Sequence, residues 1–151
     1  MPVSTVFAGL IQRVPGGGST SPNAGFAPPH ATPWLPMAPD AASVNVAGQA
    51  EDPDSILTLT RRLIALRREH PALAHGDFVE FGPSPDDTFV YERVARDERL
   101  TIVLNLGDRN RSVPGAGPGR ILIGTDRDRD GDAVDAAVEL RPNEGIVVER
   151  T

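Results

Sequence analysis

The sequence predicts a mostly β protein: a small antiparallel β-sandwich preceded by one long amphipathic α-helix and an irregular N-terminal segment. Residues 1–50 are rich in Gly and Pro and show no hydrophobic period, which is typical of loops. Residues 52–70 repeat apolar side chains at helical spacing. Later residues alternate apolar and polar side chains in short runs between turn sequences, which indicates strands. We therefore divide the chain into segments 1–50, 51–73 and 74–151.

The irregular segment is unusually long for a compact domain. A loop of this length indicates either a function or a structural context that lies elsewhere. Trp34 and Leu35 stand between two prolines, so they form an apolar cluster on an extended backbone. We expect this cluster to pack against a core, and the alternative is an aromatic residue that stacks on a sugar.

The helix is predicted over residues 52–70, DPDSILTLTRRLIALRREH. Asp52 suits the N-cap, and Pro53 suits the first helical position. Pro71 ends the helix, because proline disfavours a helical conformation in the residue before it. The apolar side chains form one stripe that another surface must cover: Ile56, Leu59, Leu63 and Leu66, widened by Leu57 and Ile64.

Strands are predicted where the hydrophobic period changes from helical to alternating. Gly, Pro, Asp and Asn fill the short connections between them. Short connections join antiparallel strands, because parallel strands need long crossovers. We expect about five to seven strands in two packed layers, with most of the aromatic side chains pointing inward. The predicted strands cover residues 77–81, 88–95, 100–106, 120–124, 137–141 and 145–150.

The overall charge and composition argue against several classes of function. A net charge of −6 and a pI near 5.0 argue against a nucleic-acid partner, whose phosphates attract basic surfaces. The chain has 0 cysteines, so it has neither disulfides nor thiolate metal ligands. No apolar run approaches the length that spans a bilayer, and the N-terminus is a poor signal peptide. We expect a soluble cytoplasmic protein with no membrane partner and no cofactor.

One motif resembles the first half of a calcium-binding loop. In such a loop, alternate carboxylates and a central glycine wrap a hard cation. The twelfth position holds Ala137 in place of a bidentate glutamate, and the flanking elements are predicted strands. We interpret the motif as a solvated hairpin loop and keep calcium binding as the alternative. The candidate ligands are Asp126, Asp128, Asp130 and Asp132.

Other chemistry-bearing residues show no catalytic or metal-binding spacing. The three histidines, His30, His70 and His75, lack the spacing of metal ligands, and we expect His70 at the helix end to be structural or exposed. The glycine run 16–18 is not followed by Lys-Ser or Lys-Thr, so it does not form a phosphate loop. No serine lies in a Gly-x-Ser-x-Gly sequence.

Several short stretches, each unspecific alone, occur in a specific order. They are SPNAGF (21–26), PWLP (33–36), Val44-Asn45-Val46, EDPDS (51–55), RRLIALRREHPAL (61–73), GDF (76–78), ERLTIVLNLGD (98–108) and PNEGIVVE (142–149). In this order they resemble the last barrel helix and the C-terminal β domain of α-glucosidases and oligo-1,6-glucosidases in the α-amylase superfamily, glycoside hydrolase family 13. The resemblance covers nearly all of the chain from residue 13 onward.

The resemblance implies a position for one residue of a sugar site. In the family, an arginine in the loop before SPNAGF lies near the sugar, and Arg13 matches it. Pro15 matches as well, whereas the glycine run 16–18 replaces the family's Met, Gln or Pro, and Trp. Arg13 is therefore a candidate substrate-binding residue by resemblance.

The resemblance also implies that these residues lack the catalytic machinery. Family members hydrolyse α-glucosidic bonds with facing carboxylates at the strand ends of a (β/α)8 barrel. A barrel takes roughly 250 residues, and this sequence has 151. We expect a non-catalytic, structural C-terminal part that binds α-glucosides weakly if at all. Its expected partner is a separate barrel domain, or a second copy bound through the helix face; the alternative is a free-standing carbohydrate-binding or protein-interaction β module.

Overall fold

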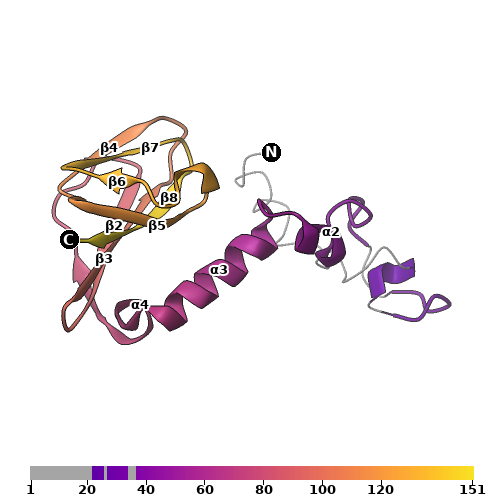
Figure 1. Ribbon diagram of the computed structural model, residues 1–151. Helices are drawn as coiled ribbons and strands as arrows, with labels where there is room; N and C mark the ends of the chain where they lie inside the picture. The colour runs from indigo at the N-terminus through magenta and orange to yellow at the C-terminus, as the bar shows by residue number, and fades with distance from the viewer. Residues whose placement is uncertain (1–21, 26, 34–36) are drawn as a thin grey trace. The chain divides into compact units, whose positions relative to one another are not determined.

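A computed structural model describes residues 22–25, 27–33 and 37–151 (Figure 1). The chain divides into two compact units, residues 1–61 and 62–151. Arg13, Trp34 and Leu35 lie outside the described residues, so what the sequence predicts for them stays a prediction. Within the described ranges, no helix is long and apolar enough to cross a membrane.

The first unit contains short helices where the sequence predicts loop. They are the 3-10 helix η1 (Pro22–Gly25) and the α-helix α2 (Val46–Glu51). Asn45 caps α2, since its side chain accepts a hydrogen bond from the Gly48 N–H at 2.9 Å. A helix of 6 residues carries too little hydrophobic period to be recognised from sequence.

The long helix α3 (Ile56–Glu69) begins later than the sequence predicts. Asp52 does not cap it, because its carboxylate accepts a hydrogen bond from the Asp54 N–H at 2.9 Å and closes a turn ahead of the helix. Ser55 is the cap instead, since its hydroxyl oxygen accepts a hydrogen bond from the Thr58 N–H at 3.2 Å.

The C-terminal end of α3 agrees with the prediction. Pro71 follows closely and opens a short second helix, α4 (Pro71–His75). No residue of α3 is buried, and Leu63 and Ile64 are 42% and 48% exposed. Part of the predicted apolar stripe therefore faces solvent.

The second unit continues as a two-layer antiparallel β fold, as the sequence predicts. The larger layer is a six-stranded sheet in the order β1-β2-β3-β8-β5-β6, and the smaller layer pairs β4 with β7. The 3-10 helix η2 (Arg127–Arg129) lies between β5 and β6. The strands are β1 (Asp77–Glu80), β2 (Thr88–Ala95), β3 (Glu98–Asn105), β4 (Arg111–Pro114), β5 (Gly119–Gly124), β6 (Ala133–Val134), β7 (Ala137–Leu140) and β8 (Gly145–Arg150).

Every predicted strand is present, with ends that agree to within two residues. Two further strands, β4 and β6, are not predicted. They are 4 and 2 residues long, and each has one buried apolar residue, Val113 or Val134. A single inward residue gives no alternation to detect.

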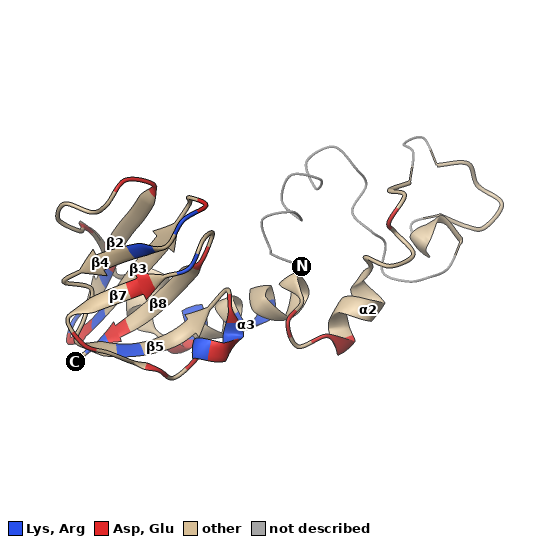
Figure 2. Cartoon of the chain, turned by 90° about the horizontal axis from the view of Figure 1, so that it is seen from above, with Lys and Arg blue, Asp and Glu red and all other residues tan. Residues whose placement is uncertain are grey.

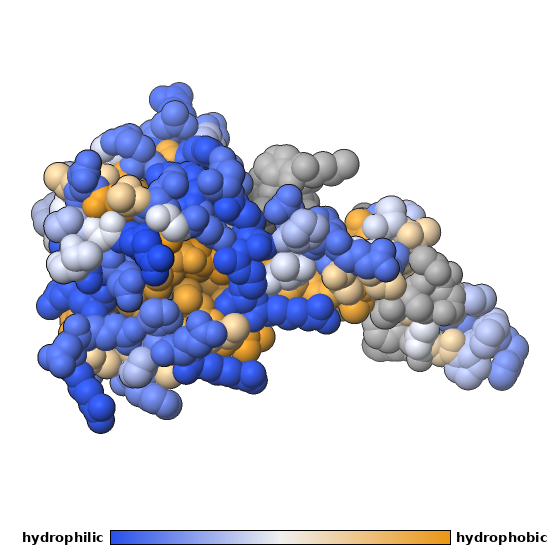
Figure 3. All heavy atoms as spheres, viewed as in Figure 1, coloured by the Kyte–Doolittle hydropathy of each residue, from blue (hydrophilic) through white to orange (hydrophobic). Residues whose placement is uncertain are grey.

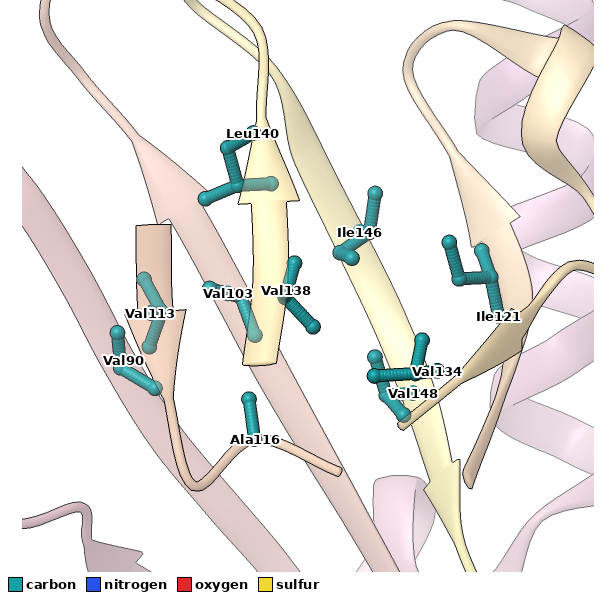
Figure 4. Packing of buried hydrophobic residues seen from close by; sticks show 10 residues of the cluster. All are labelled: Val90, Val103, Val113, Ala116, Ile121, Val134, Val138, Leu140, Ile146 and Val148. Atoms are coloured by element: carbon teal, nitrogen blue, oxygen red, sulfur yellow. The ribbon is translucent and has the colours of Figure 1, made fainter. Parts of the chain in front are cut away.

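The hydrophobic core of the β unit lies between its two sheets (Figure 4). Because side chains alternate along a strand, only one side of the six-stranded sheet faces this core. We call it the core side and the opposite one the outer side. The core residues are Val90, Val103, Val113, Ala116, Ile121, Val134, Val138, Leu140, Ile146 and Val148.

Candidate functional site

In the acidic loop around η2, two of the candidate calcium ligands bind the same arginine. Arg141 donates to Asp128 with both terminal nitrogens, at 3.0 and 2.8 Å. It also donates to Asp126 at 3.3 Å. These hydrogen bonds lower the pKa of Asp128 and raise that of Arg141 above its ordinary value. The sequence does not reveal this partner, because Arg141 lies outside the loop, in the turn between β7 and β8.

The two other candidate ligands also face arginines. Asp130 pairs with Arg62 of α3 at 2.7 Å and accepts a hydrogen bond from the Gly124 N–H at 2.9 Å. Asp132 lies 4.0 Å from Arg129. Figure 2 shows acidic and basic residues interleaved in the loops at the strand ends. Each candidate ligand thus has an arginine within ion-pair distance.

This arrangement is that of a loop held by ion pairs. Among the described residues, no group of three or more His, Cys, Asp or Glu could hold a metal ion. A guanidinium fixed between carboxylates occupies the position where a cation would otherwise balance their charge. The calcium alternative stays an untested prediction.

Two buried carboxylates lie inside the β unit, and sequence reasoning did not single them out. Glu144 has a side chain with 0% exposure; it accepts hydrogen bonds from Arg129 at 3.0 and 3.1 Å and from the Arg141 N–H at 2.6 Å. Glu92 pairs with Arg99. Both buried carboxylates therefore hold arginine side chains in place within the β unit.

A third carboxylate joins the helices to the sheet. Glu98 of β3 meets His70 Nδ1 at 2.5 Å and accepts a hydrogen bond from the Ala72 N–H at 2.7 Å. Arg93 of β2 donates to the Ala72 carbonyl oxygen at 3.3 Å. His70 therefore has a structural partner, and α4 is fastened to β3 through the Ala72 N–H and to β2 through the Ala72 carbonyl oxygen.

Aromatic side chains gather on the outer side of the six-stranded sheet. Phe89 and Tyr91 flank the core residue Val90 in β2, so they point to the outer side. Phe78 lies opposite Arg93 in the register of β1 and β2, which places it on the same side. The ring centroid of Tyr91 is 5.2 Å from that of Phe78 and 5.4 Å from that of Phe89. We call Phe78, Phe89 and Tyr91 the aromatic face.

The prediction that most strand aromatics point inward is wrong for two of these residues. Phe78 is 57% exposed and Phe89 is 49% exposed. β1 is an edge strand, and the small sheet covers only the core side. The register of β1 against β2 could have revealed the cluster, because it brings Phe78 beside Tyr91.

A pocket adjoins the aromatic face. Its volume is about 750 Å3, and its lining includes Phe78, Phe89, Glu80 and Ser84. The loop 82–84 forms part of the wall. Figure 3 shows a mostly polar surface over the β unit, with apolar surface gathered in one central area of the visible side.

Similar proteins point to one family. The family described as "Alpha amylase, catalytic domain" matches residues 12–76. The glucan 1,6-alpha-glucosidase of Streptococcus dysgalactiae subsp. equisimilis is 33% identical over 119 residues, which make up 78% of this chain and 22% of that protein. The amino acid transporter heavy chain of Mus musculus is 33% identical over 127 residues, 74% of this chain and 24% of that protein.

A solved structure shares the fold. The trehalulose synthase MutB from Pseudomonas mesoacidophila MX-45 superposes with a TM-score of 0.75 at 30% identity, over 85% of this chain and 23% of that one. The chain is therefore a partial member of glycoside hydrolase family 13, the α-amylase family, as its sequence predicts. It spans about a quarter of the length of these relatives.

Proposed function

We propose that these residues form a non-catalytic, structural part of an α-glucosidase-like member of family 13. In this proposal, α3 and α4 contribute to a catalytic domain and the β unit supports it. The proposed partner is a barrel domain of the same family. The residues themselves hydrolyse no glucoside.

One observation carries the proposal: the catalytic-domain match ends at residue 76, and β1 begins at Asp77. Both helices that follow Ser55 therefore fall within the match, and the whole six-stranded sheet falls beyond it. The two regions are fastened to each other through Glu98 and Arg93. A segment that ends the catalytic-domain match and is anchored to the β unit suits a supporting role.

The chemistry of the buried carboxylates supports the same proposal. A retaining glycosidase places two carboxyl groups about 5–5.5 Å apart across the sugar, and one of them must be protonated. In the described β unit, the two buried carboxylates, Glu92 and Glu144, are each paired with an arginine. Both carboxylates thus serve as partners of arginine side chains inside the β unit.

The absence of hydrolysis is tested with the pure chain and 4-nitrophenyl α-glucoside. We expect no release of nitrophenol above a buffer control, because the buried carboxylates are occupied by arginines. A preparation carrying Glu92→Gln controls for a contaminating glucosidase. Turnover that scales with the concentration of the chain and survives repurification contradicts the proposal.

The supporting role is tested by transplanting the chain into the glucan 1,6-alpha-glucosidase of Streptococcus dysgalactiae, in place of the segment that it matches. We expect this replacement protein to fold and to hydrolyse an α-1,6-linked glucan, since the rest of that protein supplies the chemistry. The same protein with the segment deleted is the control and should be inactive or insoluble. An inactive replacement protein argues against the supporting role.

The exposed aromatic face gives some support to the second candidate, a carbohydrate-binding β module. Exposed aromatic rings are the side chains on which sugars stack, and Phe78 and Phe89 provide two. Calorimetric titration of the chain with isomaltose tests this candidate. Saturable binding that is lost in a Phe78→Ser/Phe89→Ser variant would favour it over the structural proposal.

A further inference from the structure

The helix α3 is fastened to the β unit just beyond its C-terminal end. One residue, His70, separates α3 from α4, and its backbone is extended. α4 is held on the sheet through both backbone groups of Ala72. Gly76 follows in such close packing that a Cβ there would lie 2.5 Å from the Ala72 carbonyl oxygen. The position at which α3 joins the β unit is therefore fixed.

Beyond this joint, the packing of α3 does not set its direction. The helix has 14 residues, and none of them is buried. It is about 21 Å long, so a small rotation at the joint moves its far end by several ångströms. Arg67 donates to the Ala74 carbonyl oxygen at 3.3 Å, but this contact lies close to the joint. A contact farther along the helix is needed to hold its direction relative to the sheet.

The acidic loop around η2 offers an oriented carboxylate for such a contact. The loop is tied to β5, because the Ile121 N–H donates to the Asp132 carbonyl oxygen at 2.9 Å and the Gly131 N–H donates to the Ile121 carbonyl oxygen at 2.8 Å. Gly131 has a φ of 93°, which glycine adopts without strain. Asp130 precedes it, and its Oδ1 accepts a hydrogen bond from the Gly124 N–H at 2.9 Å. The second carboxylate oxygen, Oδ2, is left for another partner.

That partner is Arg62, in the middle of α3. Its Nη1 lies 2.7 Å from Asp130 Oδ2, and the two side chains are 38% and 19% exposed. Arg127 of the loop lies 3.5 Å from the same oxygen. An ion pair that is partly shielded from water is screened less by salt than a fully exposed one. Arg62 lies about two turns before the end of α3, so the pair acts at a distance from the joint.

We propose that Arg62 and Asp130 form a latch, which docks α3 on the acidic loop and fixes the direction of the helix relative to the six-stranded sheet. When the latch opens, α3 turns about residue 70 while α4 stays on the sheet. Arg62 falls within the catalytic-domain match and Asp130 lies beyond it, so the latch is a second link between these regions. The acidic motif then serves to bind an arginine of this chain. The inference goes beyond the proposed function and does not depend on it.

The test measures the distance between α3 and the β unit in the full chain. Because the chain has 0 cysteines, two can be introduced for nitroxide labels, by Thr60→Cys in α3 and Ala137→Cys in β7. Both positions are exposed, and neither belongs to the latch. Double electron–electron resonance then gives the distribution of distances between the two labels.

Two variants open the latch from opposite sides, Arg62→Gln and Asp130→Asn. The asparagine oxygen can still accept the hydrogen bond from the Gly124 N–H, but its amide group cannot accept one from Arg62. The matched control is Arg61→Gln, which removes an exposed arginine next to the latch and the same amount of charge.

We expect one main distance in the unaltered labelled chain. Each latch variant should lower the ratio of molecules at this distance to all others by about threefold, since a partly exposed ion pair stabilises one arrangement by that order. The two substitutions together should do no more than either alone, because they remove the same interaction. Molar salt should act as the variants do, and Arg61→Gln should leave the distribution unchanged.

Four outcomes overturn the inference. An unchanged distribution in Arg62→Gln shows that other contacts direct the helix. An equal change in Arg61→Gln shows that the total charge of α3, rather than the pair, is responsible. A broad distribution in the unaltered labelled chain shows that the helix is not held. A change on adding millimolar calcium at constant ionic strength, absent from Asp130→Asn, assigns the carboxylate to a cation.

Discussion

Glu144 is the carboxylate on which the β unit depends most at the scale of single residues. Its side chain has 0% exposure, and both of its oxygens receive hydrogen bonds from Arg129. It also accepts a hydrogen bond from the backbone N–H of Arg141, the residue that holds Asp126 and Asp128. One buried anion therefore organises the turn between β7 and β8 and, through it, the acidic loop.

Replacing Glu144 with Ala should destabilise the chain by about 3 kcal/mol, because the largely buried Arg129 loses its close carboxylate and the Arg141 N–H loses its acceptor. Urea unfolding monitored by circular dichroism measures the change. The control is Glu149→Ala, which removes an exposed partner of Arg120 at 3.7 Å and should cost less than about 1 kcal/mol. Similar midpoints for the two variants would contradict the assigned role.

Asp128 gives the chain a predictable response to acid. The hydrogen bond from Arg141 lowers its pKa in the folded state below that of an ordinary aspartate, about 3.9. Its contribution to stability is therefore complete above about pH 4 and is lost as the pH falls through the lowered folded-state pKa. The Asp128→Asn variant should therefore lose less stability than the unaltered chain as the pH falls.

The measurement is the urea midpoint of both proteins between pH 6 and pH 2.5 at low salt. The unaltered chain should lose stability more steeply with falling pH than Asp128→Asn does, and added salt should reduce the difference, because the pair is exposed. Parallel curves for the two proteins would show that the Arg141 pair contributes nothing.

At the scale of elements, β5 and β8 approach each other so closely that one position accepts only glycine. A Cβ on Gly119 would lie 2.1 Å from the carbonyl oxygen of Glu149, which is backbone and cannot rotate away. β5 also joins β8 to β6 within the six-stranded sheet. Glycine at position 119 is therefore needed for β5 and β6 to form this edge of the sheet.

Gly119→Ala should destabilise the β unit by about 2 kcal/mol or more, the cost of forcing extra atoms into packed structure. Gly82→Ala is the matched control, since a Cβ there meets nothing within 4 Å; it should change the free energy of unfolding by less than about 0.5 kcal/mol. Thermal unfolding of both variants measures the difference. A Gly119→Ala protein as stable as the control would show that β5 can shift.

The same scale shows which elements can be predicted from sequence. β2 and β8 have their predicted limits because each is a run rich in β-branched or aromatic residues between turn sequences. The start of α3 is predicted too early because two capping residues compete, and Ser55 takes the role that Asp52 also suits. β4 and β6 escape prediction because their pairing with β7 and β5, rather than their own composition, defines them.

At the scale of the whole molecule, the family and the order of its parts are predictable, but the contacts of the candidate sites are not. Motifs in series identify the α-amylase family, because order survives where single residues change. The arginine that holds Asp126 and Asp128 comes from residue 141, and the exposure of Phe78 depends on which side of a sheet another layer covers. Both facts are consequences of tertiary structure. The expected lack of glucoside hydrolysis is a prediction at this scale, since it concerns the whole chain rather than a single residue.

The fastening of Ala72 has a practical consequence for protein engineering. The Glu98 carboxylate of β3 contacts both the His70 ring and the Ala72 N–H. Residues 70–72 therefore set the direction in which the polypeptide enters the β unit. Recombination between distant members of the family should tolerate a crossover just before His70, because His70 and Glu98 are then inherited from the same parent.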